Sequence, residues 1–152
     1  MAAKKKDLKV IGRLEPINFP EWNLYGIDAK IDTGAYTSSL HCHHIKPIEK
    51  DDGEYVRFNL LDPSHETYND KLFELPVYRK KVVKSSNGSR EDRFVVKTKV
   101  QLSDRLLTAE LSLTDRSEMR YPVLVGRKLI NGRFLVDVSQ KYLSENEIKE
   151  QT

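Results

Sequence analysis

Cysteine is almost absent from this sequence, since Cys42 is the only one. A single cysteine excludes an intrachain disulfide and is typical of a protein from a reducing compartment. No apolar run approaches the roughly 20 residues that a membrane-spanning helix needs. No apolar segment follows the basic residues Lys4–Lys6 as it would in a secretory signal. We therefore expect a cytoplasmic protein with no membrane partner.

A strong excess of charge of one sign is also missing. The 26 Lys and Arg residues are nearly balanced by 23 Asp and Glu residues, which leaves a formal net charge of +3. A dedicated nucleic-acid binder carries a larger basic excess, usually in a stripe with aromatic residues. We expect no nucleic-acid partner. Two basic clusters, Lys4–Lys6 and Arg79–Lys81 with Lys84, are expected to be solvated surface, the alternative being recognition of an acidic partner.

Helical periodicity is scarce, and alternation of apolar and polar residues takes its place. It runs through Val56–Leu60, through Phe94–Leu102 with Val95 as an interruption, and through Ala109–Leu113. Such alternation predicts half-buried antiparallel strands. Asn87-Gly88, between two apolar runs, predicts a tight hairpin.

The chain length and the strand pattern also predict the domain organisation. With 152 residues and no repeat or linker, the chain predicts one β-rich domain over residues 10–143. Residues 1–9 are expected to be a disordered extension. In the C-terminal tail, 144–152, Ser144 and Glu147 form a capping-box pattern that favours a short helix.

The first candidate for chemistry is the segment Lys30–Ala35. An apolar strand leads into Asp32, and Gly34 permits a sharp turn that would present the carboxylate at the strand end. Small hydroxyls follow in Thr37, Ser38 and Ser39, and they are suited to holding backbone amides and a neighbouring loop in place. Taken alone, Asp-Thr-Gly is a weak motif and is more often a simple turn after a strand.

A second segment supports a functional interpretation of the first. Tyr121–Val125 reads as a short buried strand that ends in Gly126-Arg127. A strand with Asp-Thr-Gly-Ala, then a polar hairpin, then an apolar strand ending in Gly-Arg is the order found in retroviral-type aspartic proteases. The sequence therefore resembles the retropepsin-like peptidases.

The resemblance is closer to one bacterial branch of these peptidases. Its members are often labelled ATP-dependent zinc proteases and are associated with ATP-grasp ligases that add glutamates to a ribosomal protein. The similarity spans roughly residues 11–143, and its blocks are Ala29–His41, Ser86–Arg93, Leu113–Met119, Leu124–Arg127 and Phe134–Asp137. It implies an all-β fold, the retropepsin-like acid-protease closed β-barrel, with one short helix after Gly126.

The zinc label finds little support in the residues. On a regular strand His41 and His43 share one face and Cys42 and His44 the other, so the four cannot converge on one tetrahedral ion. A His-Glu-x-x-His motif is absent from the sequence. We expect no metal and no cofactor, and a metal-dependent hydrolase is the least favoured of the functions considered.

Peptide hydrolysis by carboxylates needs two of them sharing one proton. The sequence has one Asp-Thr-Gly, because Asp137 lacks the following Thr-Gly. The resemblance thus implies a homodimer in which Asp32 of each copy forms the dyad. In that family Thr33 locks the two catalytic loops together, Gly34 lets the backbone approach the substrate, and Ala35 fills a small position behind it.

The expected activity is that of an aspartic-type peptidase on acidic or glutamate-rich peptide, such as a polyglutamate-modified protein. The hairpin around residues 85–90 stands where the family has its flap, but its tip is polar. The candidate substrate-binding residues are Ala35, Thr37, Ser38, Ser86, Asn87, Gly88, Arg90, Arg93, Arg116 and Arg127.

Two alternatives stay open. Arg116 and Arg127 could instead pair with acidic residues of the same chain, namely Asp115, Glu118 or Asp137. The whole protein could also be a non-catalytic retropepsin-like dimer that binds acidic peptide tails. Residues 62–70, which the shorter retroviral relatives lack, receive no predicted role.

Overall fold

The computed structural model describes residues 8–60, 72–84, 87–115 and 120–144. Several sequence predictions fall outside these ranges: the N-terminal extension up to residue 7, the extra residues 62–70, Ser86, Arg116 and the helix expected after Ser144. The described chain consists mostly of strands. The strands are β1 (Lys9–Gly12), β2 (Leu14–Phe19), β3 (Leu24–Ile31), β4 (Ser38–Lys50), β5 (Gly53–Leu60), β6 (Leu72–Pro76), β7 (Arg79–Lys84), β8 (Arg90–Leu102), β9 (Arg105–Thr114), β10 (Val123–Val125) and β11 (Phe134–Asp137).

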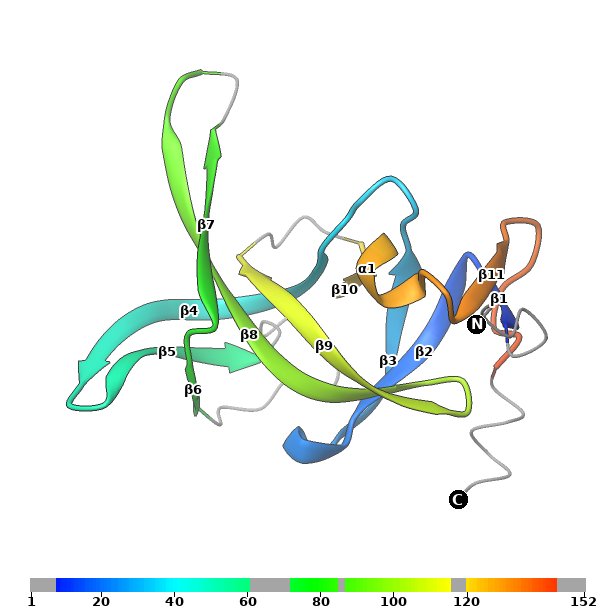
Figure 1. Ribbon diagram of the computed structural model, residues 1–152, viewed down its shortest axis with the longest axis horizontal. Helices are drawn as coiled ribbons and strands as arrows, with labels where there is room; N and C mark the ends of the chain where they lie inside the picture. Colours follow the sequence, from blue (N-terminus) through cyan, green and yellow to red (C-terminus); the bar gives the residue numbers. More distant parts are fainter. Residues whose placement is uncertain (1–7, 61–71, 85–86, 116–119, 145–152) are drawn as a thin grey trace, which may run out of the picture. The chain divides into compact units, whose positions relative to one another are not determined.

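Six strands close into a barrel. Their pairing follows the order β10-β3-β2-β8-β9-β4, and β4 pairs again with β10 (Figure 1). In the described ranges there is one α-helix, α1 (Arg127–Ile130), which begins directly after Gly126, and a short 3₁₀ turn, η2 (Pro20–Trp22), follows β2. The retropepsin-like barrel with one short helix is therefore confirmed. None of the described helices is long and apolar enough to cross a membrane.

The segments in which apolar and polar residues alternate form strands, as predicted. In β8 the side chains of Phe94, Val96, Val100 and Leu102 are buried, while those of Lys97 and Lys99 are exposed. Val95, which interrupts the pattern, is buried as well. The hairpin predicted at Asn87-Gly88 forms between β7 and β8, with Lys84 opposite Arg90.

The chain divides into two compact units, and β8 and β9 run through both. The first unit comprises residues up to 38, residues 98–109 and residues from 121 onward. Within it β3 pairs antiparallel with β2 and parallel with β10, and the end of β8 joins β2. Fully buried aliphatic and aromatic side chains form its core, including Ile11, Ile17, Phe19, Ile27, Ala29, Val100, Leu102, Val123 and Val125.

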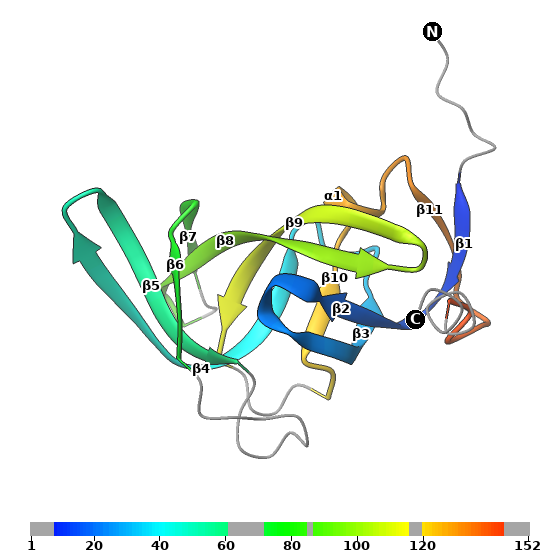
Figure 2. The same cartoon turned by 90° about the horizontal axis from the view of Figure 1, so that it is seen from below.

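A pair of strands that the sequence did not suggest also belongs to the first unit. β1 and β11 lie side by side and pair in parallel, with Lys9 opposite Phe134 and Gly12 opposite Asp137 (Figure 2). β1 thus begins at Lys9, the last residue of the expected extension. The two strands are short and lie far apart in the chain. Because they pair in parallel, no local turn or hairpin signal in the sequence predicts the pairing.

The second unit comprises residues 39–97 and 110–120. Its strands β4, β5 and β6 form an antiparallel meander, and Phe58 of β5 stacks on Phe73 of β6 with ring centres 6.0 Å apart. The register of β4 against β5 shifts between His43 and Lys46, and His44 has a φ of 56°. The strand alternation that we expected across His41–His44 therefore ends at His44, because a bulge adds a residue there.

Candidate active site

The Asp-Thr-Gly segment lies where two parallel strands end together. Val125, the last residue of β10, stands opposite Ile31, the last residue of β3. The backbone N–H of Asp32 donates to the Val125 carbonyl oxygen at 2.8 Å, which continues the ladder by one residue. The two segments that the sequence analysis singled out, one after each strand, are thereby brought side by side at one edge.

A tight turn then presents the Asp32 carboxyl group. The Gly34 N–H donates to Asp32 Oδ1 at 3.0 Å, and the Ala35 N–H donates to the Asp32 carbonyl oxygen at 3.2 Å. A Cβ at position 34 would lie 3.2 Å from the same carboxylate oxygen, so glycine leaves that oxygen room. Asp32 is half-buried while Thr33 and Gly34 are exposed. A carboxyl group in this position is fixed in orientation and still reachable by water and substrate.

The loop after Asp32 is fastened to the start of α1. The N–H groups of Arg127 and Lys128 donate to the carbonyl oxygens of Ala35 and Tyr36, at 2.8 and 3.0 Å. These two N–H groups would have no partner within the helix itself. The N–H of Gly126 donates to the buried hydroxyl oxygen of Ser38 at 3.0 Å. Ala35 and Ser38, two of the predicted substrate-binding residues, thus support the loop, and half-buried Thr37 lies between them.

Gly126 is required by the closeness of this contact. A Cβ on Gly126 would lie 2.6 Å from the Tyr36 carbonyl oxygen and 2.9 Å from the Thr37 carbonyl carbon. Its φ of −94° is ordinary extended backbone. Glycine is therefore needed here for space and not for backbone conformation.

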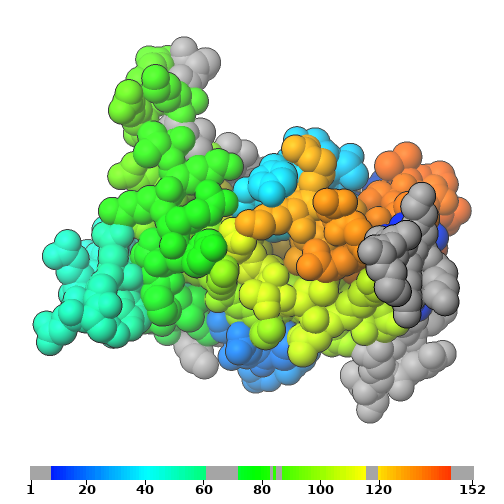
Figure 3. All heavy atoms as spheres, viewed as in Figure 1, coloured from blue at the N-terminus to red at the C-terminus, as the bar shows by residue number. Residues whose placement is uncertain are grey.

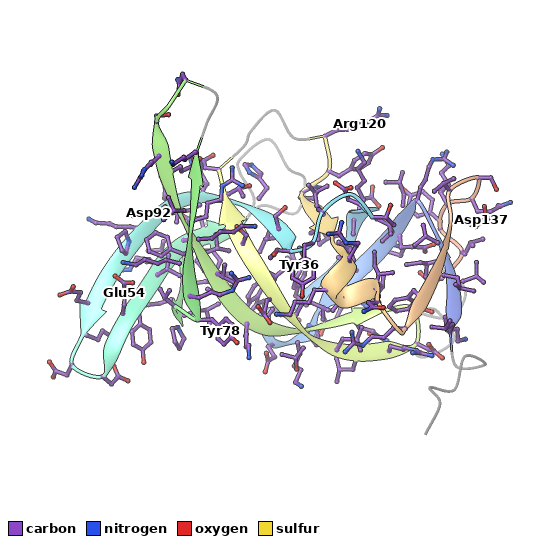
Figure 4. The ribbon with its side chains drawn as sticks, turned by 45° about the horizontal axis from the view of Figure 1, so that its top comes forward. Tyr36, Glu54, Tyr78, Asp92, Arg120 and Asp137 are labelled. Carbon is purple, nitrogen blue, oxygen red and sulfur yellow. The ribbon has the colours of Figure 1, made fainter. Side chains whose placement is uncertain are left out.

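The side chain of Arg127 contacts the Asp-Thr-Gly turn. Its Nη1 donates to the Thr33 carbonyl oxygen at 2.9 Å, and its Cζ lies 5.8 Å from the centre of the Tyr36 ring. Figure 4 shows Tyr36 beside α1. Arg127 is not paired with Asp137 among the described contacts, and Asp137 accepts hydrogen bonds from the Ser139 hydroxyl and N–H at 2.6 and 3.0 Å. These bonds lower the pKa of Asp137.

An open pocket of about 830 Å³ adjoins this turn. Thr33, Tyr36, Arg127, Arg133 and Phe134 are among the residues that line it. Tyr36, whose side chain is 56% exposed, was missed by the sequence analysis. The available signal was an aromatic residue directly after Asp-Thr-Gly-Ala.

Four further predicted substrate-binding residues, Asn87, Gly88, Arg90 and Arg93, lie on the β7–β8 hairpin of the second unit. Asn87 Oδ1 accepts hydrogen bonds from the N–H and hydroxyl of Ser89, and Gly88 has a φ of 86°, so together they form the tip. Arg90 is exposed. Arg93 is mostly buried, with its Nη2 3.7 Å from Glu91 Oε2. Asp32 belongs to the first unit, so the structure describes these two groups of predicted residues separately.

The histidine cluster has partners of its own. His43 Nδ1 lies 3.5 Å from Asp115 Oδ2, and His44 Nδ1 lies 2.9 Å from Asn59 Oδ1. Cys42 is fully buried, which raises the pKa of its thiol well above 9.0, and Asp115 raises it further. A protonated buried thiol is a poor metal ligand. In the described ranges no three His, Cys, Asp or Glu side chains are placed to hold a metal ion.

Comparison with known proteins agrees with this geometry. The family model RimB-like, described as the retropepsin-like aspartic endopeptidase RimB, matches residues 10–147. The chain belongs to the RimB-like family. The resemblance to retropepsin-like peptidases read from Asp-Thr-Gly-Ala and Gly-Arg is thereby confirmed.

Relatives of this RimB-like chain fall into two groups. Proteins named probable alpha-L-glutamate ligase, from Desulfotalea psychrophila and Shewanella pealeana, are 32% and 34% identical over 95% and 88% of this chain. The chain spans only 33% and 29% of their lengths. The crystal structure of the Legionella pneumophila protein Lpg0085, described as of unknown function, is 32% identical with a TM-score of 0.73, covering 90% of this chain and 98% of that one.

Proposed function

We propose that this RimB-like chain is an aspartic-type peptidase whose dyad consists of Asp32 from each of two copies. The observation that carries the proposal is the placement of Asp32: a half-buried carboxyl group, fixed by the N–H of Gly34, at the joint end of β3 and β10. In the family that the chain belongs to, this turn is the catalytic element. No cofactor enters the proposal.

The chemistry requires the second copy. Two carboxyl groups about 3 Å apart cannot both ionise readily, so one stays protonated. The ionised one takes a proton from a water molecule, which attacks the peptide carbonyl carbon, while the protonated one donates its proton to the carbonyl oxygen. Asp32 is the only aspartate that precedes Thr-Gly in the sequence, so the same residue of a two-fold-related copy supplies the second carboxyl group.

We propose acidic, glutamate-rich peptide as the substrate. Support comes from relatives named probable alpha-L-glutamate ligase, in which the part similar to this chain makes up about a third of the protein. A peptidase part beside a part that adds glutamate is expected to act on chains that contain the added residues. Arginine side chains such as Arg90 and Arg93 are suited to carboxylates because guanidinium groups bind them in pairs of hydrogen bonds.

The decisive experiment mixes wild-type protein with Asp32→Asn. Asp32→Asn alone should bind glutamate-rich peptide but not cleave it. If each active site needs both copies of Asp32, a fully exchanged equimolar mixture retains about one quarter of the activity of the same total amount of wild type. Sites complete within one chain would retain about one half instead. Light scattering on the same samples should give the mass of two chains.

The non-catalytic alternative, a module that binds peptide without cleaving it, predicts different results. A chain that binds glutamate-rich peptide equally well before and after Asp32→Asn, and that cleaves none of it under any pH between 4 and 8, would be a binding module. A strictly monomeric protein that cleaves peptide would contradict the shared dyad while leaving the peptidase itself in place.

A further inference from the structure

The β7–β8 hairpin carries like charges in direct cross-strand opposition. In its antiparallel register Lys81 stands opposite Arg93, and Lys84 stands opposite Arg90. Like charges at directly opposed positions destabilise a sheet. Folding alone therefore does not account for placing two such pairs on one short hairpin.

Internal carboxylates neutralise only the first part of this hairpin. Arg79 lies 3.6 Å from Glu110, and Lys80 lies 3.1 Å from Glu54. Lys81, Lys84 and Arg90, by contrast, have no carboxylate within 4 Å in the part of the chain that the structure describes. Residues 81–93 carry four cationic side chains against the two carboxylates of Glu91 and Asp92, so a net positive charge remains toward the hairpin tip.

Arg93 belongs to the same group. Its side chain is only 18% exposed, its one carboxylate contact is the 3.7 Å approach to Glu91, and its buried Nε has no hydrogen-bond partner. A buried guanidinium nitrogen without an acceptor costs free energy. An added carboxylate beside Lys81 and Arg93 would offset that cost.

Another like-charge pair in the second unit differs from the hairpin pairs, because an acidic residue stands beside it. Lys46 of β4 stands opposite Arg57 of β5, but Arg57 has Glu74 of β6 opposite it on the other side. That like-charge pair lies next to an acidic neighbour in the same sheet. The hairpin pairs have none across β7, because β7 pairs with β8 alone among the described strands.

Among the residues that the structure describes, none pairs with the outer edge of β7, so this open edge can accept another strand. Such an edge offers unpaired backbone N–H and C=O groups to an extended peptide. Side chains alternate along β7, so Arg79 and Lys81 lie on one face and Lys80 and Lys84 on the other. Figures 1 and 3 show the hairpin as the green segment, and Figure 4 labels Asp92 on β8.

We propose that the open edge of β7 binds an extended polypeptide with consecutive acidic side chains, and that Lys81 and Lys84 select it. A bound strand also alternates its side chains between the two faces. A chain with an acidic residue at every position meets cations on both faces, whereas a chain with one at every second position meets them on one. The inference rests on the proposed function in one respect, namely that the bound chain is the substrate.

The test uses the full chain with Asp32→Asn, so that binding is measured without cleavage. The probe is a fluorescent peptide of six consecutive glutamates, equal in length to β7. A second peptide alternates glutamate with serine over twice that length, which keeps the number of carboxylates. Fluorescence anisotropy should show tighter binding of the first peptide, and added salt should weaken it. Equal affinity for both peptides would overturn the two-faced arrangement.

Variants of Lys81 and Lys84 test whether the peptide binds at β7. Lys81→Gln with Lys84→Gln should weaken binding of the six-glutamate peptide at least tenfold. Lys46→Gln with Lys50→Gln, a control that removes the same charge from exposed positions of β4, should change it less than twofold. Thermal unfolding checks that all variants fold. Equal loss in the control would indicate general charge attraction and overturn the assignment. Unchanged binding together with new aggregation of the double variant would mean that the lysines only protect the strand edge. Tighter lysine-dependent binding of single-stranded DNA than of peptide would overturn the partner class.

The experiments distinguish a failure of the peptidase proposal from a failure of the β7 proposal. If lysine-dependent binding is found but wild-type protein cleaves no peptide, the β7 site stands and the peptidase does not. If wild-type protein cleaves glutamate-rich peptide and the double variant leaves KM unchanged, the peptidase stands and the β7 site does not.

Discussion

Arg127 Nη1 donates a hydrogen bond to the carbonyl oxygen of Thr33 at 2.9 Å. This bond ties the first residue of α1 to the residue that follows Asp32, so the helix start and the Asp-Thr-Gly turn are directly connected. The backbone N–H of Arg127 also donates to the Ala35 carbonyl oxygen. One residue thus holds the loop on both sides of Gly34.

Replacing Arg127 should reduce activity more than stability. Arg127→Gln removes a charge-assisted hydrogen bond at an exposed position, which lowers the free energy of unfolding by about 1 kcal/mol. Because the turn loses an anchor, we expect kcat to fall about tenfold or more. The measurements are urea unfolding and peptide cleavage at saturating substrate. A rise in KM with kcat unchanged would instead assign Arg127 to substrate binding, as the sequence analysis expected.

Gly126→Ala should be among the most damaging single-methyl changes in the chain. The added Cβ would meet backbone atoms of Tyr36 and Thr37 at 2.6 to 2.9 Å, and backbone cannot move aside as a flexible side chain can. We expect a loss of about 3 kcal/mol in the free energy of unfolding. Gly88→Ala is the control, since its Cβ would meet nothing within 4 Å and only the φ of 86° is unfavourable. A cost of about 1 kcal/mol is expected there, and equal losses would contradict the steric account.

Glu15→Gln should loosen the segment that ends at Ser144. The fully buried Glu15 side chain accepts four hydrogen bonds: from the Gly12 N–H at 2.6 Å, the Leu143 N–H at 3.0 Å, and the Ser144 N–H and hydroxyl at 3.0 and 2.6 Å. An amide NH₂ would face donors where an acceptor is needed, which costs about 3 kcal/mol.

Ser144→Ala serves as the milder comparison, because it removes only the hydroxyl donor. We expect it to cost about 1 kcal/mol, against the larger loss for Glu15→Gln in the same urea titration. Hydrogen exchange should report faster exchange of the Leu143 and Ser144 amides in Glu15→Gln. Unchanged exchange at these two amides would show that Glu15 does not hold them.

Cys42 links stability to alkaline pH. Burial raises the pKa of the thiol in the folded chain above its ordinary value of 9.0. The unfolded chain therefore releases the proton at lower pH than the folded one, so this contribution to stability is present below pH 9 and is lost as the pH rises above it. Urea midpoints at pH 7.5 and 10 should differ less for Cys42→Ala than for wild type. The native thiol should also resist modification by thiol reagents, and rapid modification at pH 7.5 would contradict its burial.

Much of the fold could be predicted from sequence. Alternation with a period of two places side chains on opposite faces of a strand regardless of what lies beside it, so Val56–Leu60, Phe94–Leu102 and Ala109–Leu113 were correctly assigned to β5, β8 and β9. Asn87-Gly88 formed the expected hairpin for the same local reason. The order of the Asp-Thr-Gly and Gly-Arg segments predicted the retropepsin-like resemblance, further sequence blocks predicted the family branch, and the resemblance implied the short helix after Gly126.

Only the tertiary structure decided which distant groups meet. The placement of Arg127 on the Thr33 carbonyl, the four hydrogen bonds to Glu15 and the parallel pairing of β1 with β11 all join residues far apart in the chain. The bulge at His44 likewise depends on the register of β4 against β5. Local sequence sets the direction in which each side chain points from its strand. Strand register and loop contacts arise when the whole sheet closes, so no short segment encodes them by itself.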